Sequence, residues 1–217
     1  MTVVATFVAC KKESSDDYFV IDIQNVLGET EGITTVNAFC QYQVSDKWKE
    51  DTLAKAKFND NGFRMLLPNP PQSKYLAKIS PADWVKISDQ NAKTLSDIFF
   101  LAYNSSGEMG FFFLEGGDYN TFVDAWYIYA DRDFTVSGKY EGSQYNIKVY
   151  YEYNCTFKRG WNIRYGVIYR YDDVSISLIT TQKPADIPLS WKFYPFIHLK
   201  SQFQDPIFNH NLYVERK

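Results

Sequence analysis

Histidine, the usual catalytic base, is almost absent from this chain of 217 residues. Its two histidines, His198 and His210, both lie near the C-terminus. A serine or cysteine nucleophile needs a base held beside it, and the chain also lacks the Gly-x-Ser-x-Gly motif of a nucleophile elbow. Three cysteines without a Cys-x-x-Cys pair provide no zinc ligand set, and there is no phosphate loop or dinucleotide-binding motif. The sequence therefore predicts no catalytic triad, no metal and no cofactor.

Carboxylates offer a second route to catalysis, because a glycosidase needs only two of them at a suitable separation. The acidic residues close to predicted strands are Glu108, Glu115, Asp118, Asp124, Asp131, Asp133 and Glu152. Asp124 and Glu152 alternate with apolar residues, which predicts that they point to solvent, and the others are typical of hairpin turns. Turn formation is also the preferred role for Asp131-Arg132-Asp133 and Asp172-Asp173, although carboxylate oxygens can bind Ca²⁺. We predict no catalytic residue, and a hydrolase with a carboxylate pair is the alternative.

Aromatic residues are the most unusual feature of the composition, since 17 Tyr, 17 Phe and 5 Trp make 18% of the chain. Many of them fall in an apolar register within predicted strands, as expected for core side chains. Trp126 and Tyr150 fall in the opposite register from their strand neighbours. An aromatic ring exposed on a sheet can stack on a sugar ring, so these two residues are candidates for a ligand-binding surface. The alternative is that a loop or a second sheet covers them.

Alternation of apolar and polar residues is strongest between residues 145 and 171. Every odd position from Tyr145 to Phe157 is apolar, and the alternation resumes from Trp161 to Tyr171 after the turn Lys158-Arg159-Gly160. Two such runs around a glycine turn predict an antiparallel hairpin, and a further strand is expected from Val174. Other predicted strands lie at 36–44, 54–58, 63–67, 98–103, 109–114, 123–129 and 134–140. About twelve short strands at hairpin spacing predict an all-β fold, an antiparallel β-sandwich of immunoglobulin-like or transthyretin-like type.

The region 68–97 interrupts this pattern. The run Pro68-Asn69-Pro70-Pro71 predicts a break between two β lobes. The segment Ser80–Trp84 has an N-cap residue followed by proline, which predicts a helix of a turn or two, and residues 84–96 are expected to form a long loop. Very little other helix is expected.

The N-terminus carries a short apolar run that ends at Ala9-Cys10 and is followed at once by the charged stretch 11–17. This resembles the end of a bacterial lipoprotein signal, in which a small residue precedes the acylated cysteine. The resemblance implies cleavage before Cys10 and a lipid anchor on that residue, with 1–17 as signal remnant and tether. The predicted β-sandwich domain spans 18–196, and alternation is lost in a C-terminal extension, 197–217. The other cysteines, Cys40 and Cys155, lie in apolar registers and form either a disulfide or two buried thiols.

Two further segments resemble exported proteins of the Bacteroidetes. Residues 33–68, which end in Gly62-Phe63-Arg64-Met65-Leu66-Leu67-Pro68, are similar to a hairpin of carboxypeptidase-regulatory-like, transthyretin-like sandwiches. The run Lys158-Arg159-Gly160-Trp161-Asn162 is similar to a Gly-Trp-Asn hairpin in uncharacterised lipoproteins of the same bacteria. The resemblance implies an exported β-sandwich lipoprotein at the outer membrane or cell surface, and it carries over no functional residue other than Cys10.

Charge and hydropathy exclude other classes of protein. With 23 Lys and Arg against 26 Asp and Glu, the net charge is −3, whereas a nucleic-acid-binding protein needs a concentrated basic face. No apolar run is long enough to span a bilayer as a helix, so membrane contact is expected through the lipid anchor only. We therefore predict a non-catalytic binding or accessory module of the cell envelope, with a glycan or a protein as its ligand. A carbohydrate-active hydrolase and a structural subunit of an envelope complex are the alternatives.

Overall fold

The computed structural model describes residues 17–44, 47–96, 98–144 and 146–196, and these residues form an almost entirely β structure. One short 3₁₀ turn, η1 (Ser73–Tyr75), accompanies the strands in this part of the chain. The strands are β1 (Tyr18–Ile23), β2 (Thr35–Val44), β3 (Lys47–Lys57), β4 (Phe63–Pro68), β5 (Ala77–Lys78), β6 (Val85–Ile87), β7 (Lys93–Leu95), β8 (Ile98–Asn104), β9 (Gly107–Gly117), β10 (Thr121–Ala130), β11 (Phe134–Gln144), β12 (Ile147–Phe157), β13 (Gly160–Arg170), β14 (Val174–Thr180) and β15 (Leu189–Pro195). The predicted all-β, sandwich-like class is confirmed. No helix among the described residues is long and apolar enough to cross a membrane.

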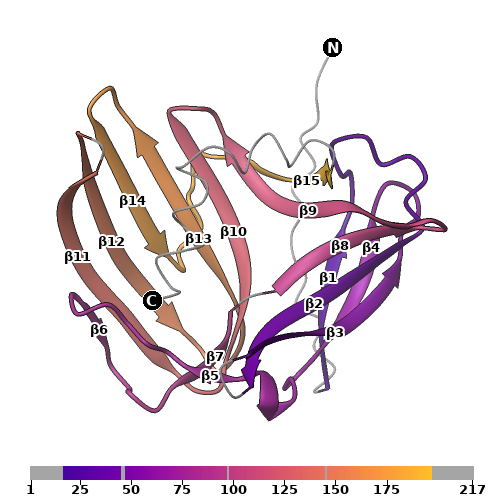
Figure 1. The fold of residues 1–217 in the computed structure, drawn as a ribbon, viewed down its shortest axis with the longest axis horizontal. Helices are drawn as coiled ribbons and strands as arrows, with labels where there is room; N and C mark the ends of the chain where they lie inside the picture. The colour runs from indigo at the N-terminus through magenta and orange to yellow at the C-terminus, as the bar shows by residue number, and fades with distance from the viewer. Residues whose placement is uncertain (1–16, 45–46, 97, 145, 197–217) are drawn as a thin grey trace.

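Two sheets make up the fold (Figure 1). The small sheet is the antiparallel pair β1–β4, and the large one has 13 strands, with β3-β2-β8-β9-β10-β13-β14-β12-β11-β6 as its main path. All pairs along this path are antiparallel except β12 and β14, which run parallel. The small sheet packs against one face of the large sheet, which gives the sandwich its two layers.

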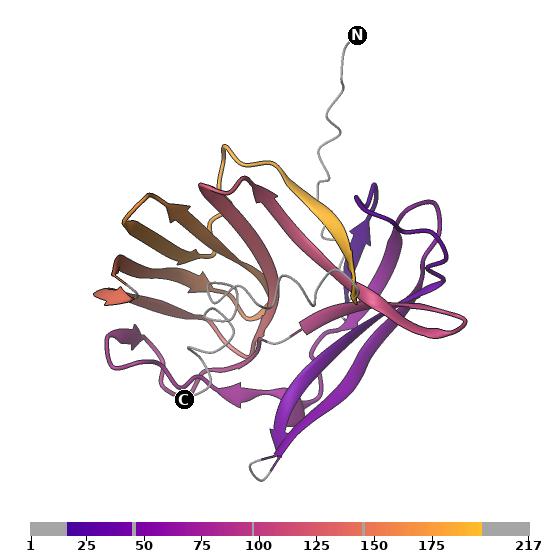
Figure 2. The same cartoon turned by 45° about the horizontal axis from the view of Figure 1, so that its top comes forward.

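The bend between the two ends of the large sheet lies at β9 and β10. The first part of β9 pairs with β8 and its last part pairs with β10, while β15 pairs along its other edge. Strands β2, β3 and β8 therefore form one half of the sheet, and β10, β13, β14, β12, β11 and β6 form the other. Figure 2 shows the second half curling away from the first.

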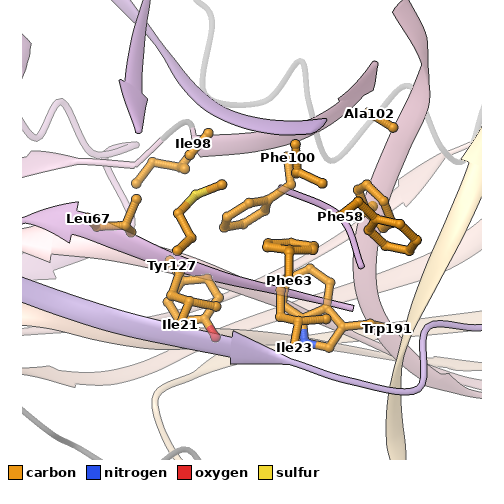
Figure 3. Close-up of a cluster of buried hydrophobic side chains, with 14 of the residues drawn as sticks. Ile21, Ile23, Phe58, Phe63, Leu67, Ile98, Phe100, Ala102, Tyr127 and Trp191 are labelled. Carbon is orange, nitrogen blue, oxygen red and sulfur yellow. The ribbon is translucent and has the colours of Figure 1, made fainter. Parts of the chain in front are cut away.

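The main core lies between the small sheet and the large one (Figure 3). Strand β4 shows why the chain folds this way, because Phe63, Met65 and Leu67 are buried while the residues between them are exposed. They meet Ile21 and Ile23 from β1, together with rings from the large sheet such as Phe100 and Trp191. Each fully buried side chain of this size contributes about 1.5–3 kcal/mol of hydrophobic stabilisation.

The predicted hairpin between 145–157 and 161–171 is wrong. Both runs are strands, β12 and β13, but β14 lies between them and pairs with each. Alternation indicates which residues share a face of a strand, and it does not indicate which strand lies next to it. The antiparallel hairpin of β13 and β14 is formed as the turn at Asp172-Asp173 predicts.

The region 68–97 also differs from its prediction, because it is neither a short helix nor a long loop. Strand β6 pairs with β11, and β7 pairs with β10 and β5. Residues 83–84, within the predicted helix, form a turn. The segment therefore adds short strands to the second half of the large sheet, through its pairing with β10 and β11.

Cys40 and Cys155 are free thiols in separate clusters of the core, so the two do not form a disulfide. The predicted lipid anchor Cys10 and the predicted extension 197–217 lie outside the described residues.

Candidate ligand-binding face

Trp126 lies in β10, on the face of the large sheet opposite the small sheet. Its neighbours in sequence, Ala125 and Tyr127, point into the core, whereas Trp126 is half-buried. Its ring meets Phe99 of β8 and Phe113 of β9 edge to face, with centroids 5.9 and 6.2 Å apart. The predicted register of Trp126 is thus the observed one, and its ring belongs to a larger group.

The larger group is a row of half-buried rings that runs across β2, β8, β9 and β10. Phe39 stacks on Phe99 at 5.3 Å, and Phe111 lies 6.3 and 6.2 Å from these two rings. Phe111 is in turn 6.1 Å from Phe113. We call this surface, with Phe39, Phe99, Phe111, Phe113 and Trp126, the aromatic face.

A groove of about 200 Å³ opens on the aromatic face. Its apolar lining consists of Phe39, Phe99, Leu101, Phe111 and Phe196, and its polar lining consists of Gln41, Glu50 and Glu108. The Gln41 amide donates a hydrogen bond to Glu50 at 2.6 Å, and the Tyr103 hydroxyl donates one to Glu108 at 3.4 Å. Apolar rings bordered by a few polar groups are the usual composition of a small-molecule site.

Trp48 extends the same surface toward the edge strand β3. It shares its side of β3 with Glu50, because side chains two positions apart lie on one face of a strand. Trp48 is 54% exposed, which is unusual for so large an apolar ring. The aromatic face therefore has an exposed tryptophan at one end and a half-buried one, Trp126, at the other.

A cluster of charged residues lies beside Trp126. Glu115 of β9 stands directly opposite Asp124 of β10 in the ladder. Glu115 is buried, and its Oε1 accepts hydrogen bonds from the Lys192 ammonium at 3.2 Å and from the Tyr194 hydroxyl. Burial raises the pKa of the Tyr194 hydroxyl, and its hydrogen bond to Glu115 acts in the same direction, so Tyr194 is a donor.

The side chain of Asp124 reaches from β10 to the neighbouring strand β13. Its Oδ1 accepts a hydrogen bond from the Gly166 amide at 3.1 Å. A Cβ on residue 166 would lie 2.4 Å from that oxygen, so the carboxylate occupies space that only glycine leaves open. Burial raises the pKa of Asp124, against the lowering effects of Trp126, the Arg164 charge and the Gly166 amide.

The predictions for these two carboxylates are wrong, because Asp124 is enclosed rather than directed to solvent and Glu115 is buried within β9 rather than placed in a turn. Donors of the protein itself hold both side chains. Lys192 and Tyr194 bind Glu115, while Gly166 binds Asp124. The contacts tie β9, β10, β13 and β15 together beside Trp126, on the same face of the sheet. The arrangement supports a structural role in positioning the ring.

The other predicted acidic residues are engaged in turns and surface pairs. Asp118 caps the β9–β10 turn by accepting the amides of Asn120 and Thr121. Glu152 pairs with Lys139 at 3.1 Å. Their roles match the expectation of turn formers and solvent-facing side chains.

Asp131 and Asp133 are also held by their surroundings. The Lys93 amide donates to Asp131 at 2.9 Å, and the Arg159 amide donates to Asp133 at 2.8 Å. Among the described residues there is no group of three or more His, Cys, Asp or Glu that could hold a metal ion.

Tyr150 and Trp126 lie on opposite faces of the large sheet. The ladder from β10 through β13 and β14 to β12 places Tyr151 on the side of Trp126 and Tyr150 on the other. There the Tyr150 hydroxyl donates a hydrogen bond to Glu141 at 3.2 Å. The two predicted candidates therefore do not form one site.

Trp48 and the phenylalanines of the aromatic face are not among the residues predicted from the sequence. Two signals point to them. Phe99-Phe100-Leu101 and Phe111-Phe112-Phe113 are unbroken apolar runs, which indicate strands with two apolar faces. Trp48 stands between Lys47 and Lys49, an unusual sequence context for a large aromatic residue.

Comparison of the chain with protein-family models, with curated proteins and with solved structures gives no match. The function is therefore inferred from the residues of the aromatic face.

Proposed function

We propose that this protein is a non-catalytic binding module of the bacterial cell envelope that holds a carbohydrate on its aromatic face. The groove of about 200 Å³, with aromatic rings in its floor and Gln41, Glu50 and Glu108 at its border, carries the proposal. A sugar ring has an apolar C–H face and a rim of hydroxyl groups. The C–H face can stack on groove rings such as Phe99 and on Trp126, which lies 5.9 Å from Phe99 beside the groove, while the hydroxyls can hydrogen-bond to the polar border.

Affinity electrophoresis of the full chain, with Cys10→Ser to keep it in solution, tests this proposal. Plant, host and microbial polysaccharides are cast into the gel one at a time. We expect one of them to retard the protein, and we expect Trp126→Ala to weaken the interaction about tenfold, equivalent to about 1.4 kcal/mol. Tyr150→Ala is the matched control, because that ring lies on the opposite face of the sheet.

Glu108→Ala gives an independent reading of the same site. This exposed carboxylate borders the groove, and its removal leaves the packed rings in place. Weaker retardation of a correctly folded Glu108→Ala protein supports the site. Failure of every polysaccharide to retard the parent protein contradicts the proposal.

The envelope location rests on the sequence around Ala9-Cys10. We expect the mature protein extracted from membranes to begin at Cys10 and to carry acyl chains there. The mass of the N-terminal peptide measures this directly. An unmodified Met1 or a free Cys10 thiol would overturn the lipid anchor and leave the sugar-binding proposal untouched.

A further inference from the structure

A second group of aromatic rings lies on the same side of the large sheet as Trp126, farther along the same half of the sheet at β12, β11 and β6. Trp84 precedes β6, Tyr140 lies in β11, and Tyr151 and Tyr153 lie in β12. The Trp84 ring is 5.7 Å from Tyr140, 6.4 Å from Tyr151 and 5.4 Å from Tyr153, measured between centroids. Tyr140 and Tyr151 stand opposite each other in the ladder, 6.2 Å apart. We call these four residues the tyrosine cluster.

Two glycines of β11 make room for the tyrosine cluster. A Cβ on Gly138 would lie 2.4 Å from the Trp84 carbonyl oxygen and 3.2 Å from the Trp84 ring. A Cβ on Gly142 would lie 2.4 Å from the Tyr140 hydroxyl oxygen. Trp84 thus packs closely against the backbone at Gly138, and Tyr140 against that at Gly142. Larger residues at positions 138 and 142 would displace both rings.

The polar atoms of the tyrosine cluster are largely unused. In the described part of the chain, the hydroxyls of Tyr140 and Tyr151 and the indole N–H of Trp84 make no hydrogen bond. Tyr140 is 43% exposed, whereas Trp84 and Tyr151 are half-buried, and burial raises the pKa of the Tyr151 hydroxyl. The cluster therefore combines partly exposed ring surface with three hydrogen-bonding groups to which the described residues provide no partner.

We infer that the tyrosine cluster is a second carbohydrate-binding site, separate from the groove. A sugar ring offers both C–H groups for the aromatic surface and hydroxyls for the free O–H and N–H groups. A purely apolar ligand would bury those polar groups without partners, which is unfavourable. The ring groups carry no formal charge, so the cluster favours a neutral sugar over an ionic ligand.

The separation of the two sites follows from the strand order. Trp126 lies in β10 and Tyr151 in β12, with β13 and β14 between them. Three strand spacings correspond to about 14 Å along the sheet. Each site therefore has a tryptophan of its own, Trp126 beside the groove and Trp84 in the cluster.

Nuclear magnetic resonance of the tryptophan indole N–H groups tests this inference in the full chain carrying Cys10→Ser. The five indole signals are assigned with single Trp→Phe variants. The protein is then titrated with neutral oligosaccharides prepared from cellulose, xylan, mannan and starch. We expect at least one of these sugars to shift the Trp84 signal in a saturable manner, while the buried Trp191 signal stays unchanged.

The two indole signals separate this inference from the proposed function. A shift of Trp126 without any shift of Trp84 would overturn the second site and leave the groove standing. A shift of Trp84 alone would support the cluster and count against the groove. If no oligosaccharide shifts either signal, both are wrong.

Variants of the tyrosine cluster then test whether its free hydroxyls and rings make the contact. We expect Tyr151→Phe and Tyr140→Ala each to weaken the saturation of the Trp84 shift by about threefold to tenfold. Tyr171→Ala, which removes an exposed ring from the β13–β14 turn, is the matched control and should have no effect. Unchanged affinity in both cluster variants, with the fold intact, would overturn the inference.

Discussion

Asp124 and Asp51 are carboxylates whose pKa values shift in opposite directions from the usual value of 3.8. Burial raises the pKa of Asp124. The pKa of Asp51 is lowered, first by its hydrogen bond from Lys74 at 2.7 Å and then by that from Tyr75 at 3.0 Å. A carboxylate whose pKa is raised in the folded state stabilises the folded protein below pH 3.8. This stabilisation is lost as the pH rises through the folded-state pKa. For a lowered pKa, the stabilisation is present above pH 3.8 and is lost as the pH falls through the folded value.

The two asparagine variants should therefore respond to pH with opposite signs. At neutral pH, Asp124→Asn should raise the free energy of unfolding, because it removes a buried charge and keeps an acceptor for the Gly166 amide. Asp51→Asn should lower it, because the charge that Lys74 pairs with is gone. Urea denaturation from neutral pH down to pH about 3 measures both differences, and each should shrink at the acid end of the range. Equal pH profiles for the two variants would contradict the assignment of these environments.

Cys40 and Cys155 are predicted to be unreactive while the protein is folded. Burial raises the pKa of each thiol to about 11, and the Asp51 charge adds to this effect at Cys40. The thiolate is the reactive form, so both side chains stay protonated and shielded at mildly alkaline pH. With Cys10→Ser, a chromogenic disulfide reagent should label neither thiol in the native protein and both in guanidinium chloride. Rapid labelling of either one in the native state would show that its cluster of the core opens easily.

At the scale of the elements, the alternation of residues is enough to predict most strands. Phe63, Met65 and Leu67 in β4 are buried in the predicted register. Alternation fails to predict strand order, as β14 between β12 and β13 shows. For the same reason, the sequence alone cannot show whether Trp126 and Tyr150 share a face of the sheet. Their faces can be compared only once the pairing of the strands between them is known. The aromatic face and the tyrosine cluster depend on long-range pairing, so the sequence alone predicts single rings and does not predict either group.

The pairing of β9 with β15 depends on two glycines of β9. A Cβ on Gly110 would lie 2.1 Å from the Tyr194 carbonyl oxygen, and one on Gly116 would lie 2.1 Å from that of Pro188. Both are backbone atoms of the β15 segment, so they cannot move aside as a flexible side chain does. We expect Gly110→Ala and Gly116→Ala to lower the free energy of unfolding by about 1–3 kcal/mol each, as measured by urea denaturation.

Gly32→Asn serves as the control for these variants. Gly32 has a positive φ of 81°, no atom lies within 4 Å of the position that its Cβ would take, and asparagine tolerates this conformation better than most residues. The Gly32→Asn variant should change the free energy of unfolding much less than either β9 variant does. A loss for Gly32→Asn that equals the loss for Gly116→Ala would mean that the close approach of β15 is not the cause.

At the scale of the molecule, β10 joins the clusters of the core into one unit. Its residues Tyr127 and Tyr129 belong to the main core, Ile128 and Ala130 to the cluster with Cys155, and Val123 to a third cluster. The Trp161 indole N–H also donates a hydrogen bond to the Pro68 carbonyl at 3.0 Å, which links β13 to β4. Because one strand contributes to every cluster, neither half of the large sheet keeps a complete core without the other.

We therefore expect the described domain to unfold in a single cooperative transition, despite the break at Pro68-Asn69-Pro70-Pro71. Met65→Ala alters the main core and Ile87→Ala alters the cluster at the far end of the sheet, and both side chains are buried. Each should lower the free energy of unfolding by about 2–5 kcal/mol. Far-UV circular dichroism and tryptophan fluorescence, followed through urea denaturation, should show one shared midpoint that moves in both variants. A transition that splits in two, with Met65→Ala shifting one step and Ile87→Ala the other, would mean that the two halves are separate domains and that the aromatic face and the tyrosine cluster belong to different folding units.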